Sequence, residues 1–140
     1  MNSSGASFCR TAAFSVAWDH PEVFGFAGAM SGSFWWRTSS ASLDDRQSTR
    51  IMQNIVARST DPHHGFRAFL EAGTQDETAD RDGNGIIDAI DDTLWLMQKM
   101  DGLGLVRDAG YTYLEVQGGI HGYATWKSVL PQFLAWATAP

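Results

Sequence analysis

Residues 66–119 decide the fold: "FRAFLEAGTQDETADRDGNGIIDAIDDTLWLMQKMDGLGLVRDAGYTYLEVQGG". The apolar run "FRAFLEAG" predicts a strand that ends at Gly73, and "YTYLEVQGG" predicts another strand. Between them, "AIDDTLWLMQKM" places Ile90, Leu94 and Met97 at helical spacing, and the glycines of "DGLG" end the helix. A helix that connects two strands in this way predicts a parallel sheet with right-handed crossovers.

The same alternation extends toward both ends of the chain. "TAAFSVAW" predicts a short buried helix over about residues 8–19, and "VFGFAGAMSG" predicts a strand buried on both faces. Residues 31–44 are expected to form a loop. "DDRQSTRIMQNIVARS" predicts a helix with one apolar face, formed by Ile51, Ile55 and Val56. We therefore expect an α/β fold with a parallel sheet of about three strands flanked by helices, and one sheet edge that needs covering.

The last helix is predicted from "ATWKSVLPQFLAWA". Pro131 lies within this pattern, so we expect either a kink there or a late start of the helix. The expected apolar face consists of Trp126, Val129, Leu130, Phe133 and Leu134.

Composition limits the classes of protein to which the chain can belong. With 140 residues, 44% hydrophobic and 12% aromatic, we expect a single packed domain over residues 1–140. The sequence shows no signal peptide and no membrane span, so no membrane partner is expected. A pI near 4.9 without a basic patch argues against nucleic acid as a partner. Cys9 is the lone cysteine, which rules out an internal disulfide.

Residues 73–92 carry seven carboxylates and one cation, which account for the whole net charge of -6. Counted from Asp80, the spacing is that of a calcium-binding loop, with glycine at position 6 and a carbonyl ligand at position 7. We expect a loop insertion at 76–92 that binds structural calcium, and the alternative is a solvated acidic turn. Asp91 stands where EF-hands carry glutamate, and no helix precedes the loop. The pattern is therefore closer to the loop-helix half-motif of dockerins. A dockerin would need two copies of this motif, and the sequence has one. The expected ligands are Asp80, Asp82, Asn84, the Ile86 carbonyl, Asp88 and Asp91.

Three short motifs suggest nucleophilic catalysis. "GASFC", at 5–9, lacks only the last glycine of the G-x-S-x-G elbow that exposes a nucleophilic serine, here Ser7. Ser7 could instead cap the helix, and Ser3 is a rival nucleophile. "GTQD" and "GGIHGYATW" follow the second and third predicted strands and supply Asp76 and His121.

Together with "HPEVFG" and "SGSFWW", these motifs resemble the putative-esterase family of α/β-hydrolases, which includes esterase D and enterochelin esterase-like and feruloyl esterase-like proteins. The resemblance runs over residues 5–136. It implies that Ser7 is the nucleophile, Asp76 the acid and His121 the base, with the Phe8 N–H as one oxyanion donor. Two features depart from the family: "CR" replaces the two glycines after the nucleophile, and the family's first five strands have no counterpart here. The chain therefore resembles the C-terminal half of a hydrolase.

Two functions from different classes follow. The first is a serine carboxylesterase that acts on small carbohydrate-linked or aromatic esters, with Trp35 and Trp36 either lining an aromatic pocket or capping the core. The second is a catalytically degraded hydrolase fragment that persists as a calcium-stabilised, self-associating module. Its open sheet edge would be covered in a homo-oligomer or by a missing N-terminal half. Calcium loops favour an extracellular or periplasmic location.

Overall fold

The computed structural model describes residues 4–38, 47–61, 63 and 65–139, with the side chains of residues 4–8 and 47 left aside. Helices and strands alternate as predicted, and the three strands are all parallel in the order β1-β2-β3. The predicted α/β fold is therefore confirmed. The elements in chain order are α1 (Ser4–Asp19), β1 (Phe26–Met30), the 3-10 helix η1 (Gln47–Thr49), α2 (Ile51–Arg58), β2 (Arg67–Gln75), α3 (Asp88–Gly102), β3 (Tyr111–Ile120) and α4 (Tyr123–Ala137).

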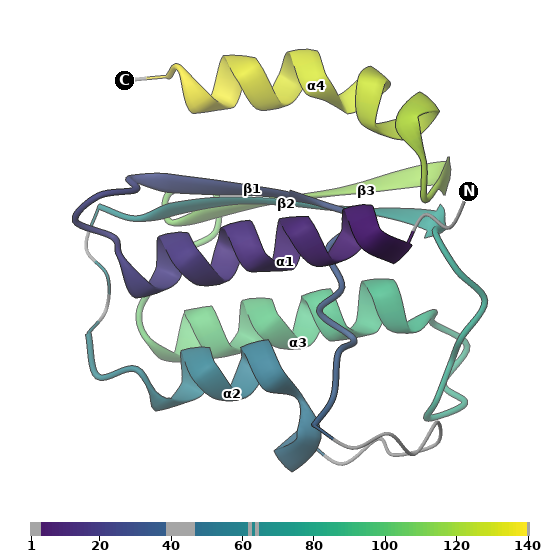
Figure 1. The fold of residues 1–140 in the computed structure, drawn as a ribbon, viewed down its shortest axis with the longest axis horizontal. Helices are drawn as coiled ribbons and strands as arrows, with labels where there is room; N and C mark the ends of the chain where they lie inside the picture. Colours follow the sequence, from purple (N-terminus) through teal and green to yellow (C-terminus); the bar gives the residue numbers. More distant parts are fainter. Residues whose placement is uncertain (1–3, 39–46, 62, 64, 140) are drawn as a thin grey trace.

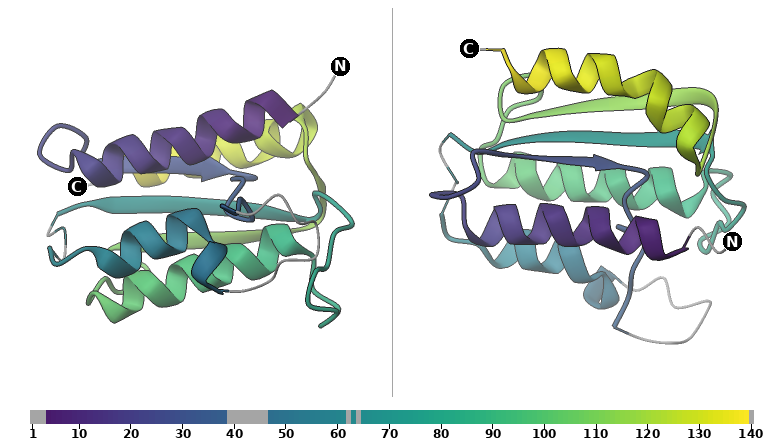
Figure 2. Two further views of the ribbon diagram at one scale, coloured as in Figure 1. Left: turned by 60° about the horizontal axis from the view of Figure 1, so that its bottom comes forward. Right: turned by 45° about the horizontal axis from the view of Figure 1, so that its top comes forward.

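The sheet separates two unequal layers of helices. Three helices, α1, α2 and α3, cover one face, and α4 alone covers the other (Figure 1). Further views show α2 and α3 side by side below the sheet (Figure 2). The core lies on the three-helix side, where the Phe14 ring meets those of Trp18, Phe34 and Phe66 at centroid distances of 5.8, 5.5 and 6.0 Å. Much of the aromatic content therefore serves this core.

The N-terminal part of the chain differs from the prediction in two ways. The first helix begins at Ser4 rather than near residue 8. A glycine such as Gly5 did not prevent this earlier start, because N–H groups in the first turn have no partner within the helix in any case. In β1, Ala27 and Ala29 are buried but Phe26 is 41% exposed. The prediction of a strand buried on both faces is wrong here, because Phe133 and Trp136 of α4 cover Phe26 only in part.

The last helix also differs from the prediction. It begins at Tyr123, so a late start is wrong, and Pro131 lies inside the helix. Leu130 and Leu134 are 44% and 52% exposed, although they were expected on the buried face. Only a narrow stripe of α4 is buried, since no second helix of the described part of the chain packs on this face (Figure 1). In the described residues no helix is both long and apolar enough to cross a membrane.

Candidate active site

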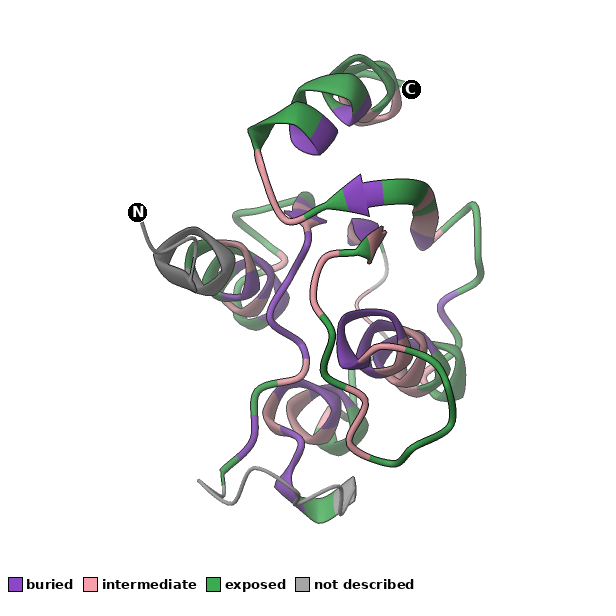
Figure 3. Cartoon of the chain, turned by 90° about the vertical axis from the view of Figure 1, so that its right-hand side faces the viewer, coloured by how far each residue is buried: buried purple, intermediate pink, exposed green. Residues whose placement is uncertain are grey.

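Asp76 and His121 each follow one of two neighbouring strands at the carboxyl edge of the sheet. Gln75 of β2 pairs in register with Ile120 of β3, so the two residues that follow leave neighbouring parallel strands at the same edge. Figure 3 looks onto this edge, where the strands end and α4 begins. In open α/β sheets this is the edge at which ligands bind.

The ends of β2 and β3 approach each other closely because both carry a glycine, Gly73 and Gly119. A Cβ atom at Gly73 would lie 2.4 Å from the Gly119 carbonyl oxygen and 2.7 Å from Asp76 Oδ1. Any side chain at Gly73 would therefore push apart the two segments that carry Asp76 and His121. Asp76 is held in a tight turn, in which its Oδ2 accepts the Gly73 N–H at 3.1 Å and its own N–H donates to the Gly73 carbonyl at 3.1 Å.

His121 is half-buried against the start of α4. Its ring meets the Trp126 ring edge-to-face at 5.3 Å, and the preceding Ile120 N–H donates to Thr125 Oγ1 at 2.9 Å. Trp126 Nε1 in turn donates to Ser31 Oγ at 2.9 Å. The histidine segment and the "SGSF" segment after β1 are thereby joined through one buried indole.

Ser7 is the fourth residue of α1, so Gly5, Ser7 and Cys9 lie within the helix rather than on a turn before it. The side chains of Ser7 and Phe8, and the whole of Ser3, lie outside the described residues. One turn further on, the guanidinium carbon of Arg10 stacks 3.5 Å from the centroid of the Trp126 ring, on which His121 also packs. The start of α1 is thus at the same edge as His121 and Asp76.

A pocket of about 430 Å³ opens beside this indole. It combines two aromatic, two aliphatic and two cationic side chains. The residues that line it are Arg10, Met30, Tyr123, Trp126, Lys127 and Leu130.

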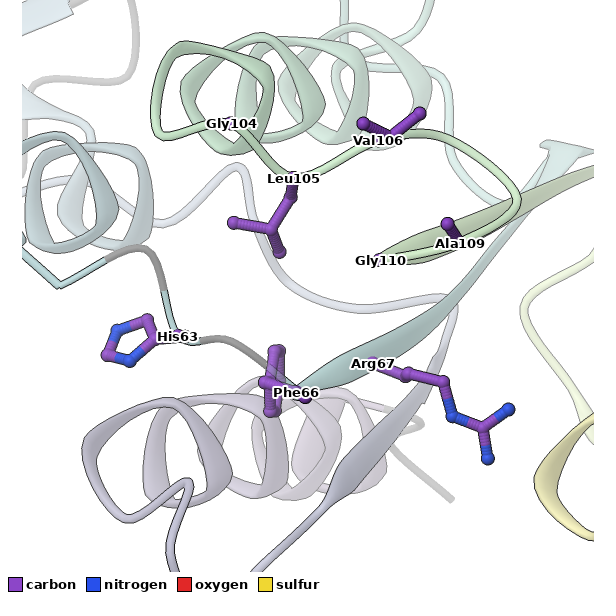
Figure 4. Close-up of a pocket in the computed structure, with 9 residues that line it drawn as sticks. His63, Phe66, Arg67, Gly104, Leu105, Val106, Ala109 and Gly110 are labelled. Carbon is purple, nitrogen blue, oxygen red and sulfur yellow. The ribbon is translucent and has the colours of Figure 1, made fainter. Parts of the chain in front are cut away.

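Trp35 and Trp36 face different parts of the molecule. Trp36 lines a groove of about 440 Å³ between α1 and α2, whereas the Trp35 ring lies 5.9 Å from the Arg81 guanidinium carbon in the acidic loop. The pocket drawn in Figure 4 lies at the amino ends of β2 and β3, opposite the candidate site, and has a volume of about 340 Å³. Its lining includes His63, Phe66 and Leu105.

The acidic loop has several features of a cation-binding loop. Asp80 accepts the N–H groups of Gly83, Asn84 and Gly85 at 2.9–3.1 Å, and these bonds, that from Gly85 foremost, lower the pKa of its carboxyl. Gly83 and Gly85 have φ of 71° and 86°, a conformation that favours glycine. Burial and then the nearby charge of Asp82 raise the pKa of Asp91. The first expected calcium ligand, Asp80, is thus held within a tightly turned loop, and the last, Asp91, lies in the first turn of α3.

Asp88 does not point toward the other expected ligands. Its carboxylate accepts the Arg81 backbone N–H at 2.9 Å and pairs with the Arg81 guanidinium. No group of three or more His, Cys, Asp or Glu side chains positioned to hold a metal ion occurs in the described ranges. The oxygen-rich donor set still suits calcium, with Asp80, Asp82, Asn84, the Ile86 carbonyl and Asp91 as the residues that could hold it.

A buried ion cluster fixes the end of this loop to the rest of the fold. Asp92 is 1% exposed and contacts Arg37 at 2.9 and 3.0 Å and Arg50 Nε at 2.6 Å. Burial raises the pKa of Asp92 and the two arginines oppose that effect. Arg50 Nη2 also lies 3.8 Å from Asp91 Oδ2.

Sequence reasoning missed two charged residues near the site. Glu71 is 1% exposed in the middle of β2, and Arg10 reaches the candidate site from α1. The signal for Glu71 was present in "AFLEAG", where a carboxylate interrupts an apolar strand. The burial of Glu77, and then the charge of Asp88, raise the pKa of Glu77 to about 7.

The three-stranded parallel sheet with flanking helices, and with Asp76 and His121 after neighbouring strands, is an α/β arrangement of the kind that binds ligands at the carboxyl ends of its strands. Residues 3–137 match the family model described as "Putative esterase", and the chain belongs to that family. This membership supports an esterase-type hydrolase and confirms the predicted resemblance. No curated protein and no solved structure matches the chain.

Proposed function

We propose that the protein is a serine carboxylesterase in which Ser7, His121 and Asp76 form the catalytic triad. The register pairing of Gln75 with Ile120 is the observation that carries the proposal, because it puts the acid and the base on adjacent strand ends. The contact of Arg10 with the Trp126 ring supports it, because Arg10 follows Ser7 by one helical turn. The family order Ser…Asp…His along the chain agrees with these roles.

The proposed reaction is a two-step acyl transfer. His121 removes the proton of the Ser7 hydroxyl as the oxygen attacks the ester carbonyl, and the Phe8 N–H donates to the resulting oxyanion. The alcohol leaves with the proton from His121, so that the acyl group remains on Ser7. Water, deprotonated by His121, then attacks the acyl-enzyme, which releases the acid and restores the serine hydroxyl. Asp76 keeps the imidazole in the required tautomer and stabilises its protonated form.

Aromatic and carbohydrate-linked esters are the proposed substrates. Tyr123 and Trp126 line the 430 Å³ pocket beside His121, and such faces bind planar acyl groups and sugar rings through apolar contact. Trp35 and Trp36 stay candidates for more distant contacts with the substrate.

Hydrolysis of p-nitrophenyl acetate by purified protein tests the mechanism. Ser7→Ala, His121→Gln and Asp76→Asn should each lower kcat/KM by about 10³-fold or more, and a fluorophosphonate should label Ser7 in mass spectrometry. Ser3→Ala tests the rival nucleophile, and Ser15→Ala, further along α1, is the matched control that should retain activity. Activity that survives both Ser7→Ala and Ser3→Ala would rule out the serine mechanism.

We further propose that structural calcium binds the loop through Asp80, Asp82, Asn84, the Ile86 carbonyl and Asp91. The ion would neutralise the repulsion among the carboxylates and tie the end of β2 to the start of α3. Asp88 is the exception within the original set, because its carboxylate pairs with Arg81. The left-handed Gly83 and Gly85 and the three N–H donors to Asp80 support this proposal.

The alternative is a self-associating, calcium-stabilised module without catalysis. The observation that favours it is the edge of β1, which has no second neighbour among the described strands and carries the exposed Phe26. This alternative predicts a dimer or larger species by light scattering and no labelling by the fluorophosphonate. A labelled monomer would exclude it.

A further inference from the structure

Glu71 lies buried beneath α4, close to the proposed triad. Along β2, Phe69 packs on Phe133 and Trp136 of α4 at 5.4 Å, and Glu71, two residues further on, lies on the same face of the strand. The side chain is almost completely inaccessible, and neither carboxylate oxygen makes a hydrogen bond of ordinary geometry to the described residues. A buried carboxylate without firm partners is costly, so its presence calls for a role.

Three charged groups, the buried Glu71 and the half-buried Arg10 and Asp76, act on one another without forming an ion pair in the described residues. Arg10 lies close enough to both Glu71 and Asp76 for the two carboxylates to act on its guanidinium, whose pKa burial lowers. Arg10 Nη1 and Asp76 Oδ1 are also buried without a hydrogen bond in the described part of the chain. One cation is therefore available to two carboxylates, and one of them is the proposed partner of His121.

The other groups that face Glu71 are few. Ser31, directly after β1, approaches with its N–H and hydroxyl, and the charge of Glu71 also acts on Tyr113 of β3. From α4, the cation Lys127 lines the pocket that Arg10 also lines. Burial and then the charge of Asp76 raise the pKa of Glu71 to about 7, against smaller opposing effects of Ser31 and Arg10. Glu71 can therefore change its charge in the range in which a histidine base also titrates.

We infer that Glu71 is a positioning residue of the proposed esterase site: its charge determines whether Arg10 is drawn to Glu71 or to Asp76. When Glu71 is ionised, it attracts Arg10 and leaves the full charge of Asp76 to His121. When Glu71 is protonated, Arg10 interacts mainly with Asp76. The positive charge of Arg10 then offsets part of the charge of Asp76, so Asp76 stabilises the imidazolium of His121 less. The inference rests on the proposed function, since it concerns the same site.

The test measures the pKa of His121 directly, by NMR titration of the imidazole signals, with His121→Gln to assign them among the four histidines. Glu71→Gln removes a negative charge and should lower the pKa of His121 by about 0.5 pH unit or more, whereas Arg10→Met should raise it. Glu115→Gln is the matched control, since it makes the same change at an exposed position on β3 and should leave the pKa of His121 unchanged.

Catalysis provides the second measurement. The acidic limb of the pH profile of kcat/KM should move to lower pH in Glu71→Gln and to higher pH in Arg10→Met. A purely structural role would lower activity equally at every pH. Unchanged His121 pKa values in both variants overturn the inference, and Arg10→Met alone suffices if Glu71→Gln does not fold. NMR shifts of the expected opposite signs, in a protein without turnover, would support the charge coupling and overturn the proposed esterase function instead.

Discussion

Replacing Glu71 by glutamine should change how the stability of the fold depends on pH. Glutamine has nearly the same shape as glutamic acid but cannot ionise. In the folded protein the pKa of Glu71 is raised from 4.5 to about 7, first by burial and then by the charge of Asp76. The folded state therefore prefers the protonated carboxyl more than the unfolded chain does. That preference stabilises the fold fully below pH 4.5 and is lost as the pH rises through about 7.

The magnitude follows from the difference between the two pKa values. Each pKa unit corresponds to about 1.4 kcal/mol, so a difference of about 2.5 corresponds to about 3 kcal/mol of unfolding free energy. Little solvent screening reduces this value, because Glu71 is only 1% exposed. Between pH 4.5 and pH 8, wild type should lose about 3 kcal/mol relative to Glu71→Gln.

Urea unfolding at several pH values, followed by tryptophan fluorescence, measures this difference. Glu77 also titrates near pH 7, but it is present in both proteins and cancels in the comparison. Glu115→Gln should run parallel to wild type, since that carboxylate is exposed. If the curves for wild type and Glu71→Gln are also parallel, Glu71 does not have a raised pKa and the reasoning from its burial is wrong.

Three further perturbations test other parts of the structure. Asp92→Asn leaves two buried arginines without their carboxylate and should lower the unfolding free energy, measured in urea, by about 3–5 kcal/mol. The exposed control Asp19→Asn should change it little. A loss near zero in Asp92→Asn would mean that the cluster does not stabilise the fold. Gly73→Ala should lower both the melting temperature and kcat/KM, because its Cβ would meet the Gly119 carbonyl at 2.4 Å, and unchanged values would refute this contact. Millimolar calcium should raise the melting temperature more than magnesium does, and Asp82→Ala should abolish the rise. If EDTA leaves the melting temperature of calcium-loaded protein unchanged, the loop is only an acidic turn.

The order of elements was predictable from the sequence because each segment carries its own periodicity. The strand "FRAFLEAG" and the helix 89–100 differ in apolar spacing, and glycines mark where they end. Their alternation implies parallel pairing, which the structure has. The position of Asp76 and His121 at one edge of the sheet follows from the same reasoning, because the carboxyl ends of parallel strands share an edge.

What could not be predicted depends on contacts between distant segments. The helical spacing in α3 identified Ile90 and Met97 as buried, but Leu96 and Met100 are fully buried as well, because α3 packs on both α2 and the sheet. Leu130 fits the apolar pattern of α4, yet it stays 44% exposed, because no second element among the described residues covers it. The ion pair between Asp88 and Arg81 could not be predicted from the spacing of the calcium-loop residues either. That spacing identifies possible ligands but not the other cations of the chain with which they can pair.

The acidic loop is anchored independently of any ion. Its C-terminal end is held by Asp92, whose bonds to Arg37 and Arg50 join α3 to the segments before and within the start of α2. Its N-terminal end is held by Asp76 in the turn after Gly73. Between them, residues 78–79 and the longer stretch 82–86 are exposed. Calcium would therefore order the tip of the loop and leave the register of β2 and β3 unchanged. For that reason an esterase that depends on Asp76 and His121 should lose stability before it loses its catalytic geometry when the ion is removed.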